Sequence, residues 1–426
     1  MFSDIIQSLG SGVPDLQVEA LTSAQNTVLL WSPQSSSTPP THLLPHILAA
    51  VAGAAGLPIP GESLCSAAST FSGDAASGGG GASALDDFGG GEESSEERVI
   101  SLGLELLYTC LDVTKEAQGA AARTSMLATP GALRILFALV DPQTGLSDES
   151  TARAARILNE LATSHPRTFL RAGGLRAIVS AALASSQLAL RDPTLSSIEA
   201  CADVGASSRA DAASAVDALA PLVRALREEY RFTARGARLV TPSGLQLTAV
   251  PALLVGGAAG RSFSHFVSTL SATATGHWRA WDDAYAARAP PATVPRVPAN
   301  WAHAALTDLV DAGILYIWAA ALAAHAAAAG VADDDAPALE VTGTRLASFL
   351  VPEAALAPLV AALARVVKVL QIADALGVGG GAGGRVAAQL VNDCRLAHVL
   401  SLLLGAPRER DHVLDAALVS AIDVLV

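Results

Sequence analysis

Three histidines and three aspartates in one region are the first residues of this 426-residue chain that could do chemistry. They are His265, His277, His303, Asp282, Asp283 and Asp308. Imidazole and carboxylate groups bind zinc when several of them meet on one face of an element. No HxxxH or HxxE spacing links these residues. We therefore interpret them as ordinary surface or core side chains and predict neither a metal site nor a cofactor.

Two further patterns resemble catalytic or nucleotide-binding motifs but lack the required context. Ser262 and Ser264 lie beside His265, yet the GxSxG nucleophile elbow is absent. Gly379 to Gly384 satisfies GxGxxG, which binds a dinucleotide only between a strand and a helix. The preceding residues, 366–378, have a helical period, so we interpret the glycine run as a flexible linker. No catalytic residue is predicted, and enzymatic activity stays open.

The four cysteines argue for a reducing compartment. Cys65, Cys110, Cys201 and Cys394 lie far apart and form no CxxC pair. A zinc ribbon or a disulfide framework is therefore not indicated. We expect reduced thiols and a cytoplasmic or nuclear location.

Charge and composition exclude several classes of protein. The net charge is −13, and the 27 Lys and Arg residues are scattered, which argues against a surface that binds nucleic acid. Hydrophobic residues make up 51% of the chain and aromatic residues only 4%. Alanine favours helices, whereas β-sandwiches draw on aromatic and β-branched residues. An all-α fold with a large core is therefore predicted.

One apolar stretch, residues 312–332, is long enough to cross a bilayer. It is mostly alanine, contains His325, and has acidic rather than basic flanks. We interpret it as a buried solenoid helix, with a membrane span as the alternative. The overlapping stretch Trp301 to Ile317 has an amphipathic pattern. The first 15 residues lack the basic and apolar regions of a secretory signal.

Related segments recur along the chain at nearly constant intervals. Leu133 in PGALRIL lies 42 residues before Leu175 in AGGLRAI, which lies 44 residues before Leu219 in VDALAPL. A helical period in the low forties is typical of armadillo and HEAT repeats. We therefore predict an α-α solenoid, in which each repeat covers the apolar face of its neighbour.

The glycines of the repeated turn have a specific physical role. In RAGGL, Gly173 and Gly174 let the chain turn sharply between two helices and remove side chains where those helices approach closely. The helix after this turn is expected to line a concave groove that receives extended peptides. Arg134 and Arg176 each follow the turn leucine, so they are candidates for hydrogen bonds to acidic ligands. Ala220 occupies this place in the third copy, and two solvated arginines are the alternative.

Residues 158–183, LNELATSHPRTFLRAGGLRAIVSAAL, carry a resemblance to a known family. They resemble the N-terminal armadillo region of HECT-type ubiquitin ligases of the thyroid-hormone-receptor-interactor and KAKTUS group. The matching residues are His165, Leu170, Ala172, Gly173, Gly174 and Leu175. The helix with Cys201, the stretch Asp217 to Val223 and the opening Ile5 to Leu21 also resemble that family. The resemblance covers about residues 3–51 and 99–230, and it implies recruitment of protein substrates.

The resemblance does not extend to a catalytic domain. No cysteine lies in the context of the family's thioester cysteine, and no match is seen beyond Tyr230. The chain ends inside an apolar helical pattern, so we expect a fragment of a larger ligase or a divergent relative without the enzyme. Such a chain would bind substrate polypeptides and the ubiquitin-conjugation machinery. The alternative is a generic armadillo adaptor unconnected with ubiquitin.

The expected organisation has five parts. A first armadillo-like repeat (1–52) precedes a disordered Gly-rich acidic insertion (53–97) that could also bind a partner. Armadillo-like repeats (98–230), an irregular helical and Pro-rich linker region (231–300) and C-terminal helical repeats (301–426) follow.

Overall fold

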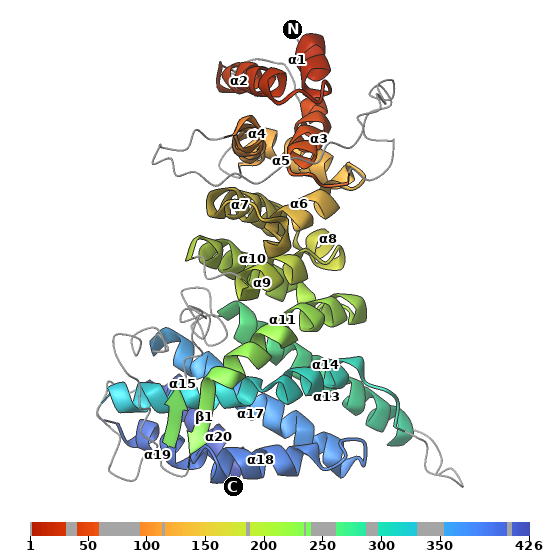
Figure 1. Ribbon diagram of the computed structural model, residues 1–426. Coiled ribbons are helices and arrows are strands. Elements are labelled where there is room, and N and C mark those ends of the chain that lie inside the picture. The colour runs from red at the N-terminus through yellow and green to blue at the C-terminus, as the bar shows by residue number, and fades with distance from the viewer. Residues whose placement is uncertain are drawn as a thin grey trace, which may run out of the picture. The chain divides into compact units, whose positions relative to one another are not determined.

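The described chain is almost entirely helical (Figure 1). The computed structural model describes residues 2–30, 41–58, 94–112, 116–184, 188–233, 236–239, 261–286, 297–329, 353–406 and 411–426. The predicted all-α class is confirmed. The chain divides into two compact units, Met1–Ser164 and His165–Val426, called here the N-terminal and C-terminal units.

In the N-terminal unit, each helix packs against helices that lie one to three positions away in the order of helices. Helix α4 packs on α2 and α3, α7 packs on α4 and α6, and Figure 1 shows α2, α4 and α7 one below another. The helices are α1 (Phe2–Leu9), α2 (Pro14–Leu30), α3 (Leu44–Ala54), α4 (Ser95–Leu111), α5 (Glu116–Ala128), α6 (Ala132–Val140) and α7 (Asp148–Ser164), with 3-10 turns at Thr41–Leu43 and Pro142–Thr144.

The C-terminal unit continues the same kind of packing. Helix α11 contacts α9 and α14, α13 contacts α10 and α17, and α17 contacts α20. The helices are α8 (Pro166–Arg171), α9 (Gly174–Ala184), α10 (Arg191–Gly205), α11 (Arg209–Glu229), α13 (Arg261–Ala286), α14 (Trp301–Ala312), α15 (Ile314–Ala328), α17 (Glu353–Ala375), α18 (Ala382–Asn392), α19 (Leu396–Gly405) and α20 (His412–Leu425), with a 3-10 turn at Leu188–Leu190.

One element was not expected from the sequence. Strands β1 (Tyr230–Thr233) and β2 (Gly236–Leu239) form an antiparallel hairpin in which Tyr230 pairs with Leu239. It directly follows α11, so the helical pattern is interrupted after Glu229.

The glycine-rich acidic segment begins and ends in helices. Helix α3 runs to Ala54, and α4 begins after Ser94, whose hydroxyl accepts a hydrogen bond from the Glu97 N–H at 3.2 Å. The Glu97 carboxylate accepts in return from the Ser94 N–H, which completes a capping box. The acidic run therefore includes the start signal of α4. Residues 59–93, most of the expected insertion, lie outside the described residues, as do most of the Pro-rich stretch 288–298 and residues 240–260.

The expected role of the repeated glycines is confirmed. Gly131 and Gly173 have φ of 79° and 84°, a left-handed conformation that a side chain disfavours. Each carbonyl then accepts the first hydrogen bond of the next helix, from Ile135 and Ala177 at 3.0 and 3.1 Å. At Gly174, a Cβ atom would collide with the Phe169 ring. Helices α8 and α9 can therefore meet closely only because this residue has no side chain.

The interpretation of Gly379 to Gly384 as a flexible linker is wrong. Gly381 has φ of 76° and precedes α18, and its carbonyl accepts a hydrogen bond from the Arg385 N–H at 3.2 Å. A Cβ atom on Gly383 would lie 2.6 Å from the Leu370 carbonyl carbon. The run is thus another helix-starting turn, with a close approach to α17, and its glycines serve geometry rather than flexibility.

The third sequence copy differs from the first two. Leu133 and Leu175 lie in the first turns of α6 and α9, whereas Leu219 lies in the middle of α11, which begins at Arg209. The 44-residue spacing therefore predicts a helix at this place but not where that helix begins.

The apolar stretch 312–332 is not one continuous helix. Gly313 has φ of 109° and separates α14 from α15, whose 15 residues include Trp318 at 0% exposure. The amphipathic pattern of Trp301 to Ile317 is therefore two helices. Within the described residues, α17 is long and apolar enough to cross a membrane, with 61% of its most apolar window buried. The pair α14 and Ile314–Ala326 passes the same test together but is bent by 58°.

A buried carboxylate on α11 forms hydrogen bonds and ion pairs that link α11 to α8. The Asp211 side chain has 0% exposure and accepts hydrogen bonds from Arg171 Nε at 2.5 Å and Ser208 Oγ at 2.7 Å, with Arg167 Nε at 3.3 Å. Burial alone would raise the pKa of Asp211, but the hydrogen bonds from Arg171, Ser208 and Ser207 outweigh it and hold the pKa below its ordinary value. The ionised form therefore stabilises the fold.

We predict that Gly174→Ala destabilises the C-terminal unit by about 1–3 kcal/mol, because the new methyl group overpacks the contact with Phe169. Urea denaturation followed by tryptophan fluorescence measures this, since four of the five tryptophans lie in that unit. Gly276→Ala is the control. Its site on α13 is open, so it should be neutral or stabilising by up to about 1 kcal/mol. Equal effects of the two substitutions would contradict the close-approach argument.

We also predict that Asp211→Asn costs about 1–3 kcal/mol at neutral pH, because a buried, charge-assisted network is lost. Asp217→Asn, on the same helix, should cost less than about 1 kcal/mol, because its pair with Arg176 is exposed. Stability contributed by Asp211 is present above its unfolded pKa and is lost as pH falls through the lower folded pKa. The difference between wild type and Asp211→Asn in urea melts should therefore close in strongly acidic solution. A constant difference down to acid pH would show that the carboxylate charge is not responsible.

Candidate peptide groove

Helices α9, α11 and α14 of the C-terminal unit line an open groove with a cavity volume of about 770 Å³. Helix α11 provides one continuous side of it. Its exposed residues recur every three or four positions, so they share one face of the helix. These residues are Arg209, Ala213, Asp217, Pro221 and Arg224.

Small apolar side chains make the buried part of the lining. They come from both α11 and α14 and leave room above the two backbones. They are Ala212, Val216, Ala220, Ala305 and Ala312. Trp301, at the start of α14, is half-buried and offers a large flat apolar surface beside them. The groove therefore has space and apolar area for the side chains of another polypeptide.

The groove contains charged side chains of both signs, from α9, α11 and α14. Arg176 of α9 and Asp217 of α11 pair at 2.9 Å, and both side chains are more than half exposed, at 65% and 61%. The remaining charges are Arg209 and Arg224 on α11 and Asp308 and Asp311 on α14. Within the described residues, none of these four side chains forms an ion pair. One wall is therefore basic and the other acidic.

The two predicted site residues have different outcomes. Arg176 lines the groove, where its guanidinium forms an ion pair with Asp217. Arg134 lies on α6 of the N-terminal unit, where its side chain is exposed. The peptide-binding role of both residues stays a prediction. The sequence does not assign Trp301, Arg209 or Asp308 to a groove, because their only signal is an exposed helical spacing that many solvated faces share.

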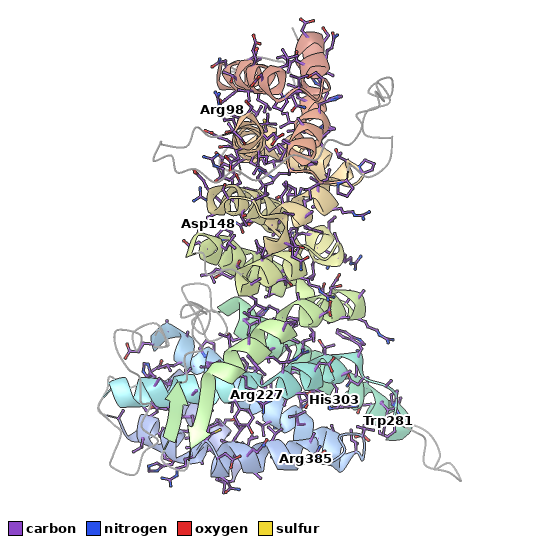
Figure 2. All side chains as sticks on the ribbon, in the orientation of Figure 1. Arg98, Asp148, Arg227, Trp281, His303 and Arg385 are labelled. Atoms are coloured by element: carbon purple, nitrogen blue, oxygen red, sulfur yellow. The ribbon has the colours of Figure 1, made fainter. Side chains whose placement is uncertain are left out.

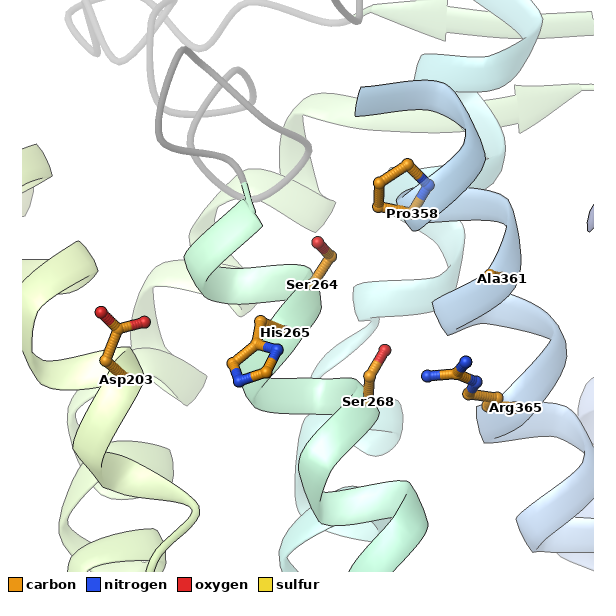
Figure 3. A pocket seen from close by; sticks show the side chains of 7 residues that line it. All are labelled: Asp203, Ser264, His265, Ser268, Pro358, Ala361 and Arg365. Carbon is orange, nitrogen blue, oxygen red and sulfur yellow. The ribbon is translucent and has the colours of Figure 1, made fainter. Parts of the chain in front are cut away.

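A second cavity of about 550 Å³ lies between α10, α13 and α17 (Figure 3). It contains His265 and Ser264, the residues considered for nucleophilic chemistry. Ser264 is only 4% exposed, while His265, Asp203 and Arg365 are exposed. The lining residues are Asp203, Ser264, His265, Ser268, Pro358, Ala361 and Arg365.

The histidines and aspartates considered as metal ligands are distributed over separate places. His277 packs edge-on to Trp301 with 5.9 Å between the ring centroids, and His303 packs on Trp278 with 5.1 Å between them. Asp308 lines the groove. Asp282 and Asp283 are exposed near the end of α13. Among the described residues, no three metal-ligating side chains come together.

The cysteine thiols that the structure describes in the core are not poised as nucleophiles. Burial raises the pKa of Cys201 to about 12, and burial together with Asp393 raises the pKa of Cys394 to about 12. Catalysis by cysteine needs the thiolate, which these environments disfavour.

Comparison of the sequence with protein-family models and with curated proteins finds no match.

Three buried polar atoms on α13, α14 and α17 have no hydrogen-bond partner in the described chain. They are Nε1 of Trp278, Nε2 of His303 and Oδ1 of Asp374, from α13, α14 and α17. Burial lowers the pKa of His303 below its ordinary value, and the Asp374 charge offsets this only in part. The imidazole, labelled in Figure 2, is therefore held mainly neutral.

We predict that the C-terminal unit loses stability as pH falls below about 6.5, the unfolded pKa of histidine. Below this pH the His303 imidazole is protonated in the unfolded chain but stays neutral in the folded chain, because its folded pKa is lower. The free energy of unfolding therefore falls with pH until the folded pKa is passed. His303→Gln cannot take up this proton, so its urea midpoint should fall less between pH 7.5 and pH 5. His277→Gln replaces an exposed imidazole on α13 and serves as control. Identical pH profiles for wild type and His303→Gln would contradict this assignment.

Proposed function

We propose that the chain is an α-α solenoid of armadillo/HEAT-like repeats that binds other proteins. Two observations support the solenoid. Helices in each unit pack on helices within three positions of them in the order of the described helices, and similar glycine turns start α6, α9 and α18. This arrangement is what stacked repeats with nearest-neighbour contacts require.

The groove between α9, α11 and α14 carries the functional part of the proposal. It combines a floor of small residues, a half-buried tryptophan and charges of both signs, four of which form no ion pair with any residue that the structure describes, within one open cavity. Small-molecule sites are usually more enclosed and mostly apolar, whereas a charged, open groove suits a segment of polypeptide.

The charge distribution favours a ligand of mixed charge in an extended conformation. Arg209 and Arg224 of α11 would bind acidic side chains of the ligand, while Asp308 and Asp311 of α14 would bind basic ones. Neighbouring side chains of an extended chain point to opposite sides. An acidic residue next to a basic residue could therefore engage both walls at once, with an apolar side chain over Trp301.

A role as the substrate-recruiting region of a HECT-type ubiquitin ligase is the more specific form of this proposal. Its support is the resemblance at residues 158–183. Such a role needs no catalytic residue in this chain, since recruitment and ubiquitin transfer would be separate tasks. The raised pKa values of Cys201 and Cys394, which disfavour the thiolate, are compatible with it. A general armadillo adaptor in the cytoplasm or nucleus would use the same groove.

Selection of peptides from a random phage library on the full chain tests the groove. We expect peptides that carry acidic and basic residues side by side, and about tenfold weaker binding of them by Trp301→Ala, the loss expected for a central aromatic contact. Asp308→Arg should select a different set, depleted in basic residues, because it converts the acidic wall.

Arg385→Glu, on the exposed face of α18, is the charge-reversal control and should bind the original peptides unchanged (Figure 2). Peptides that bind wild type, Trp301→Ala and Asp308→Arg equally would contradict the assignment of the groove.

A further inference from the structure

The cavity between α10, α13 and α17 brings together hydrogen-bond donors from two helices. Arg365 of α17 and His265 and Ser268 of α13 all line it. Figure 3 shows the Arg365 guanidinium pointing toward the Ser268 hydroxyl, with the His265 ring one turn away on the same helix. Three donors of different kinds therefore face one open space.

These donors are not used by the fold. Within the described residues, Arg365, His265 and Ser268 form no hydrogen bond or ion pair. Arg365 and His265 are exposed, so neither side chain contributes much packing. A guanidinium without a structural carboxylate partner is available for a ligand.

The one acidic residue of the lining lies away from the guanidinium. Asp203 of α10 is on the opposite side of the His265 ring from Arg365 in Figure 3. An anion held by Arg365 and Ser268 would have the imidazole between itself and this carboxylate.

We propose that this cavity binds a phosphate group, held by Arg365 and Ser268 with His265 as a third donor. A guanidinium presents two parallel N–H groups to neighbouring oxygens of one anion, and phosphate offers further oxygens to the hydroxyl and the imidazole. A volume of about 550 Å³ exceeds what phosphate alone fills, so the group would belong to a larger molecule. That molecule is a free phosphorylated metabolite or a phosphoserine side chain. The site is independent of the groove, which α9, α11 and α14 line.

Titration calorimetry with inorganic phosphate on the full chain tests the site. We expect saturable binding that Arg365→Gln weakens at least about tenfold, because the charge-assisted hydrogen bonds of the guanidinium are lost, and that Arg365→Lys partly restores. Lys368→Gln is the matched control, because it removes one exposed positive charge one turn further along α17, outside the cavity lining. It should bind phosphate like wild type, and circular dichroism should show all variants folded.

A blocked peptide Gly-Ala-phosphoserine-Ala-Gly and its unphosphorylated twin separate the two ligand sources. Tighter binding of the phosphopeptide than of phosphate assigns the site to a phosphorylated protein. Binding of phosphate without binding of the phosphopeptide assigns it to a small phosphorylated molecule. Absence of binding by both probes, or equal weakening by Arg365→Gln and Lys368→Gln, would overturn the proposal.

Discussion

Burial of small apolar side chains between successive helices is the interaction on which the rest of the structure depends. Alanine fills much of the core, and α15 alone buries Ala319, Ala320, Ala321 and Ala324 at 2% exposure or less. Each such residue contributes little apolar area, so stability requires many close helix contacts. Close contact is possible because the side chains are small. The same property leaves an open groove between α9, α11 and α14, where larger residues would fill the space.

Glycines and a buried charge fix helix positions that contacts between alanine side chains leave undefined. Left-handed glycines at 131, 173 and 381 set where α6, α9 and α18 begin, and Gly174 and Gly383 let neighbouring elements approach. Asp211 then fixes α8 against α11 through directional hydrogen bonds. Alanine faces alone could slide past one another, so these features define how neighbouring helices pack within each unit.

The sequence predicts the helical class and most helices of residues 99–230, because apolar periodicity and glycine turns act locally. It also predicts the physical role of Gly173 and Gly174. It does not predict the break at Gly313, since the apolar pattern runs on through this residue. It also misinterprets Gly379 to Gly384, because glycines of a turn and glycines of a linker look alike in sequence. Arg176 was identified by its place after a turn, but its pairing with Asp217 needs coordinates. The places of Trp301 and Arg365 in their cavities depend on contacts between helices that are distant in sequence, which the sequence alone does not predict.

Hydrogen exchange followed by mass spectrometry on Leu175→Ala tests the nearest-neighbour packing most directly. Leu175 is 1% exposed in α9, and its truncation should cost about 2–5 kcal/mol. In a stack of repeats, exchange should accelerate in α8 to α11, which contact one another, and change little in α18 to α20. Uniform acceleration across the whole C-terminal unit would show a single cooperative globule and contradict the solenoid.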